Sequence, residues 1–384
     1  MDCLGRPKSV IKRGEKSGIR MRWSPQQEDA LAAVAAWLKR GDTPVFRLFG
    51  YAGTGKTTLA RHIAEDIDGD VAFAAYTGKA AHVLRSKGCE GAGTIHSLIY
   101  RPRIGEDEEQ PVFAINHESA ATKAELIIID ECSMVDEELG RDLLSFGTPV
   151  LVLGDPAQLP PVKGGGFFTE AEPDKMLTEV HRQAQDNPII RLSMAVRAGE
   201  TLDYGEHGES RVIPRRSIDA AQILGADQVL VGTNKTRRAY NQRIRELKGL
   251  LSPMPAVGDK LVCLRNDKQK GLLNGGTWNV SKLGSPKRSL LRLDLVPEDE
   301  PGAKAVKVGV HPNFFENGGE DLAYAQRRNS DEFDYGYALT VHKSQGSQWD
   351  DVVLFDESYA FREHRDRWLY TGLTRAAERI TIVR

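Results

Sequence analysis

The stretch Leu48-Phe49-Gly50-Tyr51-Ala52-Gly53-Thr54-Gly55-Lys56-Thr57-Thr58 decides the fold. The spacing from Gly50 to Thr57 matches the phosphate-binding loop G-x-x-x-x-G-K-[ST]. The apolar run 44–49 before the loop predicts a buried strand, and residues 57–66 after it have the spacing of a helix. A glycine-rich turn that joins a strand to a helix by chance is the alternative interpretation. The strand, turn and helix together favour a loop that binds a nucleoside triphosphate.

The chemistry of the loop indicates ATP and Mg²⁺ as its ligands. Its glycines let backbone N–H groups surround an anion, and the helix N-terminus adds a partial positive charge. Lys56 can reach the β- and γ-phosphates, while the hydroxyl of Thr57 can bind Mg²⁺. The nucleotide-binding residues predicted in this loop are Gly50, Gly53, Thr54, Gly55, Lys56, Thr57 and Thr58.

Length and composition indicate a multidomain globular protein. The 384 residues give room for two or three domains, and the 40% of apolar residues argues against global disorder. The net charge of −2 gives no general basic footprint, so a nucleic acid would have to be held by a local groove.

Cysteine usage and hydropathy indicate a cytoplasmic protein with no membrane partner. The four cysteines are far apart and lack CxxC spacing, which argues against a disulfide framework or a zinc site. No apolar run approaches the ~18 residues of a membrane span, and no secretory signal is recognisable. The cysteines are Cys3, Cys89, Cys132 and Cys263.

Apolar runs that end in polar residues recur along the chain and predict a doubly wound parallel sheet. Residues 71–75, 126–129, 150–153 and 229–231 are such runs. Ligands of these sheets bind at the carboxyl ends of the strands. The polar residues in these positions are Thr77, Lys79, Asp130, Glu131, Gln158, Thr233 and Asn234.

Asp130 and Glu131 follow the most aliphatic of these runs and suit ATP hydrolysis. Asp130 is placed to hold Mg²⁺ through a water molecule, and Glu131 is placed to orient and deprotonate the attacking water. Gln158 can hydrogen-bond a γ-phosphate. A pair of helix-capping acids is the alternative, which the four preceding aliphatic residues and the upstream loop disfavour.

Changes in pattern along the chain predict two α/β domains that each contain an insertion. Two short β-like runs flank an acidic tip at 105–109, which predicts a small hairpin, and Gly/Pro/Asn turns between short strands predict a small barrel. The N-terminal basic segment is either a nucleic-acid-binding arm or a solvated tail. The expected boundaries are 1–22 for the basic arm, 23–165 for domain 1, 99–125 for its hairpin, 166–251 with 329–384 for domain 2, and 252–328 for the barrel.

Six motifs in order resemble those of a superfamily-one DNA helicase, most closely the RecD and bacteriophage Dda branch, which moves 5′ to 3′ on single-stranded DNA. The resemblance implies two RecA-like P-loop domains with ATP in the cleft between them. It also implies a hairpin in the first domain and an SH3-like barrel in the second. The motifs are 50–57, Asp130-Glu131, Gly154-Asp155-x-x-Gln158, His181-Arg182-Gln183, 340–346 and Tyr370-x-x-x-Thr374-Arg375-Ala376.

The resemblance also implies roles for individual residues. Gln27 resembles an adenine-reading glutamine, and Arg182 and Arg375 resemble two arginines that reach the γ-phosphate. His181 falls where relatives place a ring that stacks on the base, and Phe113 is expected to meet the duplex from the hairpin. The positions that resemble strand-contacting residues are Thr77, Lys79, Thr94, His96, Thr233, Asn234, Thr340 and His342.

The implied partners are single-stranded DNA and DNA forks, with replication or recombination proteins as possible associates. Two alternatives remain open: a nucleotide-dependent switch ATPase that does not move on DNA, and the motor subunit of a RecD-like nuclease complex. Two features depart from the pattern of the family. Tyr51 stands where a proline is common, and the acidic hairpin tip is unlike a surface that meets phosphates.

Overall fold

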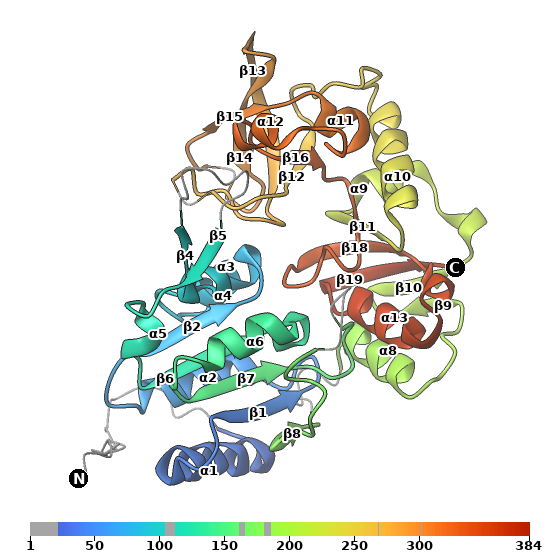
Figure 1. Cartoon of the computed structure of the whole chain (residues 1–384). Coiled ribbons are helices and arrows are strands. Elements are labelled where there is room, and N and C mark those ends of the chain that lie inside the picture. The colour runs from blue at the N-terminus through green and yellow to red at the C-terminus, as the bar shows by residue number, and fades with distance from the viewer. Residues whose placement is uncertain (1–21, 104–111, 161–165, 180–185, 268, 301) are drawn as a thin grey trace. The chain divides into compact units, whose positions relative to one another are not determined.

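A computed structural model describes residues 22–103, 112–160, 166–179, 186–267, 269–300 and 302–384. The described residues fall into two compact units, one built mainly from residues up to Asp186 and the other from Asn187 onward. Each unit contains a six-stranded sheet, and the two are described separately below (Figure 1).

The first unit is built on a parallel sheet with the strand order β3-β2-β6-β7-β1-β8. Every strand runs parallel to its neighbours, so the carboxyl ends of all six strands lie on one edge. The strands are β1 (Val45–Gly50), β2 (Val71–Ala75), β3 (Gly93–Thr94), β6 (Leu126–Asp130), β7 (Val150–Gly154) and β8 (Lys175–Leu177).

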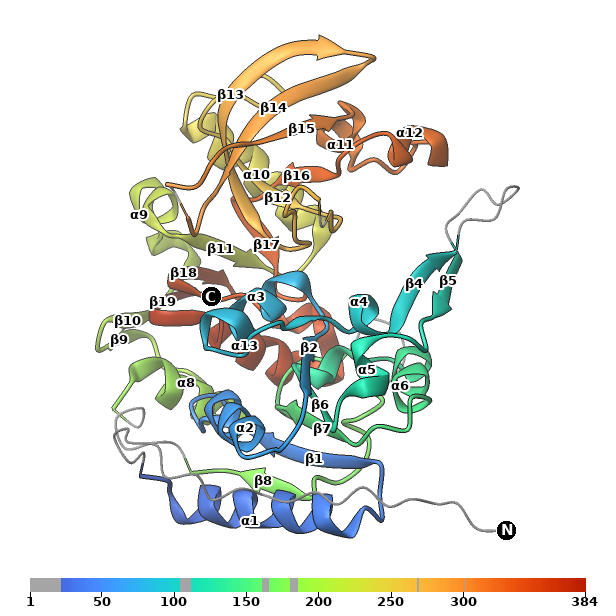
Figure 2. The same ribbon diagram turned by 90° about the vertical axis from the view of Figure 1, so that its left-hand side faces the viewer.

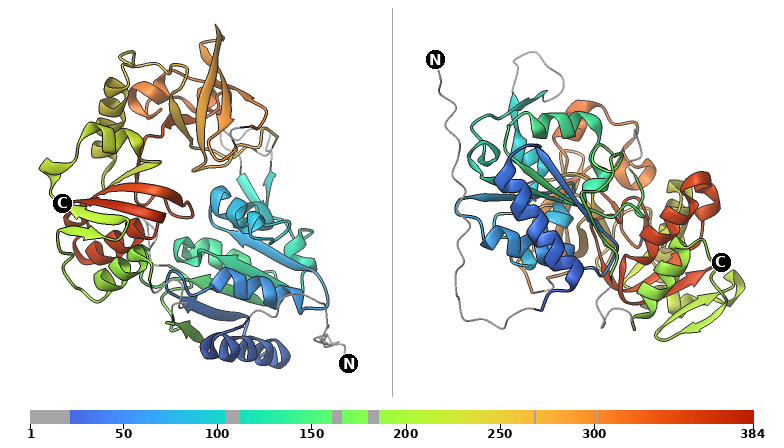
Figure 3. Two further views of the ribbon diagram at one scale, coloured as in Figure 1. Left: turned by 180° about the vertical axis from the view of Figure 1, so that it is seen from behind. Right: turned by 90° about the horizontal axis from the view of Figure 1, so that it is seen from below.

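Helices cover both faces of the first sheet, because alternate residues of its buried strands point to opposite sides. Leu48, Ile128 and Leu153 pack against α1 and α2, whereas Ile127 and Val152 pack against α4, α5 and α6. α1 lies over the strands in a view from below (Figure 3, right). The helices are α1 (Pro25–Arg40), α2 (Lys56–Glu65), α3 (Gly78–Ser86), α4 (Ile95–Ile99), α5 (Ala120–Lys123) and α6 (Glu137–Leu144), with a 3₁₀ turn at Cys132–Met134.

The second unit is built on a sheet with the strand order β17-β11-β18-β19-β10-β9. Its strands run parallel except for the edge strand β9, which is antiparallel to β10. The strands are β9 (Gly205–His207), β10 (Ser210–Ile213), β11 (Gln228–Val231), β17 (Ala338–Thr340), β18 (Trp349–Phe355) and β19 (Ala376–Val383). The helices are α8 (Pro188–Arg197), α9 (Ala220–Gly225), α10 (Asn234–Leu247) and α13 (Arg365–Leu373), with 3₁₀ turns at Arg215–Ser217 and Ser358–His364. This confirms the predicted α/β class with parallel sheets.

A five-stranded antiparallel sheet is inserted in the second unit, in the order β15-β14-β13-β12-β16. We call it the β insertion. Its core is a cluster that includes Trp278, Leu295 and Phe333, so Trp278 is a core residue. Its elements are β12 (Lys260–Cys263), β13 (Thr277–Lys287), β14 (Leu290–Pro297), β15 (Val306–Val310), α11 (Asn313–Asn317), α12 (Tyr324–Arg328) and β16 (Phe333–Tyr335). β13 and β14 continue beyond the other strands as a long ribbon (Figure 2).

Two element boundaries differ from the expected ones. β8 pairs with β1, so the first unit extends beyond residue 165, where the crossing to the second domain was expected. β16 belongs to the β insertion although it lies after residue 328. Both strands have only three residues, which is too short for sequence periodicity to reveal.

A small two-stranded sheet of β4 (Tyr100–Arg103) and β5 (Val112–Ile115) occupies the region where a hairpin was expected. The acidic tip at 105–109 and the basic arm at 1–21 lie outside the described residues. Within the described part of the chain, no helix is long and apolar enough to cross a membrane. Cys89, Cys132 and Cys263 carry free, buried thiols.

Candidate nucleotide and DNA sites

The loop 50–57 joins β1 to α2 at the carboxyl edge of the first sheet. A Cβ on Gly50 would lie 2.7 Å from Oγ1 of Thr54 and 2.8 Å from Cβ of Leu177, so the chain is too close for any side chain. Gly53 and Gly55 have φ values of +78° and +80°, a left-handed conformation that glycine adopts without strain. The glycines therefore fix the loop's shape for steric reasons.

The N-terminus of α2 is open to an anion. Gly55 occupies the N-cap position, so no side chain caps the first N–H groups, and no acid lies in the first turn. Lys56 curls back into the loop, where its ammonium donates to the carbonyl oxygens of Gly50 at 2.6 Å and of Tyr51 at 3.0 Å. Thr58 lies exposed in the first turn. Uncapped N–H groups, the helix dipole and a nearby ammonium together suit a phosphate.

Thr57 and Asp130 come together from different elements. The hydroxyl of Thr57 at the start of α2 donates to Oδ2 of Asp130 at the end of β6, at 3.1 Å. Hydroxyl and carboxylate oxygens suit Mg²⁺, which takes few protein ligands and keeps several waters beside substrate phosphates. Among the described residues, no group of three or more His, Cys, Asp or Glu side chains is placed to hold a metal. The pair therefore fits Mg²⁺ bound together with a nucleotide.

Glu131 has a strained backbone. Its φ and ψ are 55° and 45°, in the left-handed region that side chains other than glycine rarely adopt. Its N–H donates to Oδ1 of Asp130 at 2.9 Å, so the turn also orients the neighbouring carboxylate. Non-glycine residues in this conformation concentrate at functional sites.

Gln158 presents a buried, unpaired acceptor. The turn after β7 positions it, since its N–H donates to the carbonyl oxygen of Asp155 at 3.1 Å. The side chain is 8% exposed, and its Oε1 accepts no hydrogen bond from the described residues. A buried acceptor without a donor costs about 1–3 kcal/mol, so a ligand or water that donates to it would be favoured.

Gln27 has a structural role that sequence reasoning missed. Its Oε1 accepts from the N–H of Ser24, and its own N–H donates to the Ser24 hydroxyl, which forms a capping box at the start of α1. Its Nε2 donates to the carbonyl oxygen of Thr54 at 3.0 Å. Gln27 therefore joins α1 to the phosphate-binding loop. The S-x-x-Q spacing at 24–27 is the signal that could have shown the cap.

The predicted strand-contacting residues of the first domain follow β2 and β3, at the same edge as the loop. The hydroxyl of Thr94 caps α4 by accepting from the N–H of Ser97 at 3.2 Å. The ring of His96 lies between Tyr76 and Tyr100, at centroid distances of 6.1 and 5.7 Å. Burial lowers the pKa of His96, so the ring is neutral at pH 7. Thr77 and Lys79 lie where β2 leads into α3.

The second unit brings its predicted strand-contacting residues to the carboxyl edge of its own sheet. Thr340 ends β17, and Thr233 follows β11 and caps α10 by accepting from the N–H of Thr236 at 3.1 Å. The ring of His342 lies 5.3 Å from that of Phe361 in a tilted arrangement, and burial lowers the pKa of His342. Asn234 begins α10. The parallel order thus gathers residues that are 107 positions apart in the sequence, from Thr233 to Thr340.

Glu357 is a buried carboxylate at this edge that no motif pointed to. Its Oε2 accepts from the N–H groups of Gly232 at 2.6 Å and Thr233 at 3.3 Å, and its Oε1 accepts from the hydroxyl of Thr236 at 2.8 Å. The side chain is 5% exposed. Glu357 therefore fixes the start of α10. An acid two residues beyond a buried strand is the only sequence signal for it.

Arg375 lies at the opposite edge of the second sheet from Thr340, because it precedes β19 whereas Thr340 ends the parallel strand β17. It is 5% exposed. Its guanidinium donates to the carbonyl oxygens of Thr371 at 3.1 Å and Ser347 at 3.3 Å. Arg375 thus connects the end of α13 to the segment 341–348.

Three of the predicted site residues are not placed by the structure in full. His181 and Arg182 lie outside the described residues. Phe113 belongs to β5, but only its backbone is described. Their roles remain predictions.

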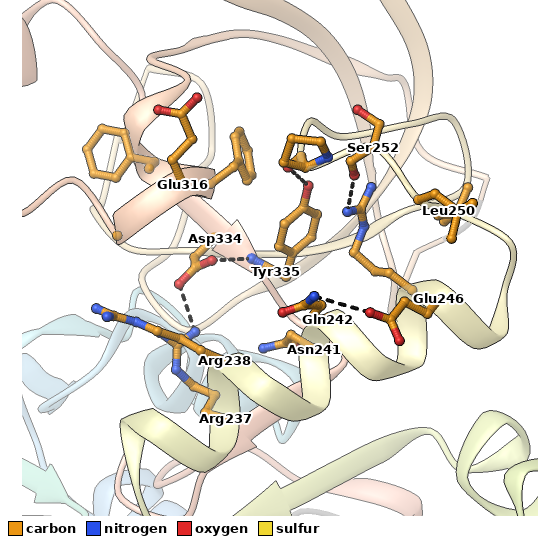
Figure 4. A pocket seen from close by; sticks show the side chains of 16 residues that line it. Arg237, Arg238, Asn241, Gln242, Glu246, Leu250, Ser252, Glu316, Asp334 and Tyr335 are labelled. Carbon is orange, nitrogen blue, oxygen red and sulfur yellow. Dashed lines mark hydrogen bonds and ion pairs between the residues drawn. The ribbon is translucent and has the colours of Figure 1, made fainter.

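A cavity of about 300 Å³ opens beside α10, lined by that helix and by parts of the β insertion (Figure 4). Two hydrogen bonds of 2.9 and 3.0 Å join Arg245 to Asp259, which is fully buried. The arginines that line the cavity all have acidic partners: Arg237 with Asp334, Arg238 with Glu320 and Arg245 with Asp259. Because these charges are neutralised internally, the cavity is a junction between α10 and the insertion rather than a site for an anion.

Two family models match parts of this chain. A family model described as an AAA domain matches residues 22–213, which is half of the chain, and one described as a UvrD-like helicase C-terminal domain matches residues 335–383. The chain is 31% identical over 362 residues to the ATP-dependent RecD2 DNA helicase of Deinococcus radiodurans, which covers 86% of this chain and 46% of that protein. It is 25% identical over 398 residues to the ATP-dependent DNA helicase Pif1 of Bdellovibrio bacteriovorus, covering 91% of this chain and 85% of that one.

Among solved structures, a Bacteroides Pif1 helicase in complex with ADP-AlF3 and single-stranded DNA has a similar fold. The TM-score is 0.56 at 18% identity, with 94% of this chain and 92% of the other covered. The chain spans less than half the length of the Deinococcus relative.

Proposed function

Because the chain belongs to the RecD- and Pif1-type helicases of superfamily one, we propose that it is an ATP-dependent DNA helicase that moves 5′ to 3′ on single-stranded DNA. The observation that carries the proposal is the 3.1 Å contact between the Thr57 hydroxyl and Asp130, beside the uncapped start of α2. This arrangement supplies a metal-binding pair and a phosphate-binding loop at one edge of a sheet.

ATP binds with its phosphates in the loop. The first N–H groups of α2 and the ammonium of Lys56 hold the β- and γ-phosphates. Gln27, whose Nε2 already donates to the carbonyl oxygen of Thr54, would contact the adenine, as the resemblance implies. Thr57 and Asp130 would hold Mg²⁺, which would supply positive charge beside the phosphates.

Hydrolysis requires a positioned water. Glu131 accepts a proton from that water as the water oxygen bonds to the γ-phosphorus and ADP leaves. The unpaired Oε1 of Gln158 accepts a hydrogen bond from the same water. Gln158 is suited to this task because its buried Oε1 lacks a hydrogen-bond donor among the described residues, so a water molecule that donates to it removes the cost of an unpaired acceptor. Arg182 and Arg375 stabilise the γ-phosphate, as the resemblance implies.

DNA binding uses the strand ends of both sheets. Small hydroxyl residues such as Thr77, Thr94, Thr233 and Thr340 allow a DNA backbone to come close and donate to its phosphates. Loss of the γ-phosphate removes charge-assisted bonds that hold the nucleotide, and alternating grips then advance the protein along the strand. The five-stranded β insertion corresponds to the SH3-like barrel that the resemblance implies. The β4–β5 hairpin corresponds to the element that separates the strands. The substrate of the protein is a DNA fork, and the protein acts in the cytoplasm.

The proposal is tested by ATP turnover with and without single-stranded DNA, in the wild type and in Lys56→Ala. We expect DNA to stimulate turnover in the wild type, and Lys56→Ala to abolish turnover while the thermal melting curve stays unchanged, because Lys56 lies at the loop rather than in the core. Lys39→Ala, which removes an exposed lysine from the last turn of α1, is the matched control and should behave as the wild type. Turnover in Lys56→Ala at the wild-type rate would refute the assignment of the loop.

A further inference from the structure

The ribbon β13–β14 carries cations that have no acidic partner. The segment 281–293 contains four basic residues and no Asp or Glu, and Lys307 on β15 lies beside it. All five basic side chains are exposed, and none forms an ion pair with a described residue, in contrast to the paired Arg237 and Arg245 of the same unit. The five are Lys282, Lys287, Arg288, Arg292 and Lys307. In a chain with a net charge of −2, this is a local concentration of unneutralised positive charge.

Glycines on both sides leave Arg292 uncovered. Gly284 of β13 and Gly309 of β15 stand directly opposite Arg292 in the register. A Cβ on Gly284 would lie 3.0 Å from Cβ of Arg292, and one on Gly309 would lie 3.4 Å from its Nη1. The guanidinium therefore extends over Gly309, where the other side chain nearest that glycine's Cβ position is the apolar Leu290, at 3.2 Å. Glycine within a strand is typical of places where a ligand approaches the backbone closely.

Two acids of the described residues lie near these cations, Asp331 and Asp294. Asp331 accepts from the N–H of Gly309 at 2.8 Å and is ion-paired with Lys270. Asp294 stands opposite Lys282 on β13 and Lys307 on β15. A single carboxylate between two ammonium groups leaves the face positive, and Arg292 in the next row adds to that charge.

A hollow of about 670 Å³ lies beside the end of the ribbon and offers hydrogen-bond donors. Oε1 of Gln326 accepts from the N–H of Ala323 at 3.1 Å, so its NH₂ group is the end that can donate outward. Nδ1 of His311 accepts from the N–H of Asn313 at 3.3 Å, which places the ring proton on Nε2. No carboxylate of a described residue lines the hollow. The lining residues are Lys287, Arg288, Ser289, Leu290, Arg292, His311, Ala325, Gln326 and Asn329.

The turn at the end of the ribbon holds its residues in a costly conformation. Arg288 and Ser289 have φ values of +53° and +61°, where Asn or Gly is usual in a two-residue hairpin turn. Non-glycine residues adopt this conformation at a cost, because their Cβ comes too close to the following carbonyl oxygen. The strained turn keeps an arginine at the tip, beside the hollow.

We propose that this face of the ribbon, with its hollow, binds the phosphate backbone of duplex DNA. The inference deepens the proposed function, on which it rests. Unpaired cations and neutral donors suit phosphate oxygens, which supply most of the affinity of sequence-independent DNA binding. Single-strand sites add aromatic side chains on which bases stack, and in the described part of the chain no Phe, Tyr or Trp lines the hollow. The free end of the ribbon also points away from the sheet that carries Thr340 (Figures 1 and 2), so it would contact DNA outside the strand held there.

The test compares the wild type with the triple variant Lys287→Ala/Arg288→Ala/Arg292→Ala. Binding is measured by fluorescence anisotropy, without nucleotide, to a 5′-tailed duplex and to the tail alone, over a range of salt concentrations. We expect the salt slope for the tailed duplex to fall by about 3, since each lost phosphate contact removes ~0.9 from it. Binding of the tail alone and ATPase activity stimulated by single-stranded DNA should not change.

Arg379→Ala is the matched control, because Arg379 is an exposed cation of the same unit that is ion-paired, with Asp351 at 2.9 Å. It should leave both affinities unchanged. An unaltered slope for the tailed duplex in the triple variant would overturn the inference, and so would an equal loss for the tail alone, which would make this a single-strand site. If the proposed function were wrong, DNA would not stimulate ATP turnover by the wild type. The binding comparison is made without nucleotide, so its outcome is independent of that result.

Discussion

At the scale of single residues, Glu131 shows a conflict between stability and chemistry. Its left-handed backbone is unfavourable for any side chain with a Cβ, yet it places a carboxylate at the end of β6, next to the pair formed by Asp130 and Thr57. A residue retained in such a conformation indicates that its side chain matters more than the strain that it introduces.

We therefore expect Glu131→Gly to be more stable than Glu131→Ala by about 1 kcal/mol, because glycine relieves the left-handed strain whereas alanine retains it. Both variants should lose ATP hydrolysis, since both lack the proposed base. Thermal and denaturant unfolding of the two variants gives the comparison, with steady-state turnover beside it. If the alanine variant were as stable as the glycine variant, the backbone at position 131 would not be strained in solution.

Arg375 allows a second prediction at this scale. Its guanidinium bonds to the carbonyl oxygens of Thr371 and Ser347, so it is held in place before any role in hydrolysis. We expect Arg375→Ala to keep nucleotide binding and to lower turnover by about 10³-fold, the scale of an arginine finger, and Arg182→Ala to do the same. Titration with a fluorescent ATP analogue and steady-state kinetics separate the two effects. Weaker nucleotide binding with no specific loss of turnover would show that these arginines only shape the pocket.

The residues of the phosphate-binding loop could be predicted because their chemistry depends on spacing over a short stretch. The approach of Thr57 to Asp130 followed from two motifs and the rule that strand ends share an edge. The buried carboxylate of Glu357 could not be predicted, because its three partners belong to a different strand and helix. The second role of Gln27, through Thr54, likewise depends on how α1 packs.

At the scale of elements, β4 of the β4–β5 pair is anchored to α6. The hydroxyl of Tyr100 in β4 donates to Oδ2 of Asp142 in α6 at 2.5 Å, and burial together with this carboxylate raises the pKa of Tyr100. Tyr100 is therefore committed to the first unit's core. Of the two aromatic residues in the hairpin, this leaves Phe113 in β5 as the candidate for contact with a duplex.

We predict that Phe113→Ala slows unwinding and spares DNA-stimulated ATPase activity, whereas replacement of residues 105–109 by an Asn-Gly turn changes unwinding little. The acidic tip would be repelled by phosphates, so it is not expected to meet DNA. Strand separation of a forked substrate, measured beside ATP turnover, tests both variants. Loss of unwinding with the shortened tip, combined with normal unwinding by Phe113→Ala, would mean that the opposite part of the hairpin contacts the fork.

The longer elements were predictable from apolar runs of four or more residues, as in β6 and β7, which are buried along their length. Short elements were not. β8 completes the first sheet, and β16 leads from the β insertion to β17 through only Gly336 and Tyr337. A Cβ on Gly336 would lie 2.8 Å from the carbonyl carbon of Leu261, so the two backbones meet closely there. Such strands are defined by tertiary pairing rather than by their own sequence pattern.

At the scale of the whole molecule, the two units repeat one design: a parallel sheet with polar residues at its carboxyl edge. We propose that ATP is hydrolysed at the carboxyl edge of the first sheet and that DNA contacts the carboxyl edges of both sheets. Opening a base-pair step costs ~1.4 kcal/mol on average, well below what hydrolysis of one ATP supplies, so energy does not limit unwinding. We expect the protein to move 5′ to 3′ on single-stranded DNA, because the resemblance to the RecD and Dda branch implies that direction.

The most direct measurement of that claim is strand separation of two otherwise identical duplexes in the presence of ATP and Mg²⁺, one with a 5′ single-stranded tail and one with a 3′ tail. The protein should separate the 5′-tailed duplex and leave the 3′-tailed one intact, and Lys56→Ala should separate neither. Unwinding that starts only from the 3′ tail would contradict the proposed direction, and no ATP-dependent unwinding of either substrate would contradict the proposed helicase activity itself.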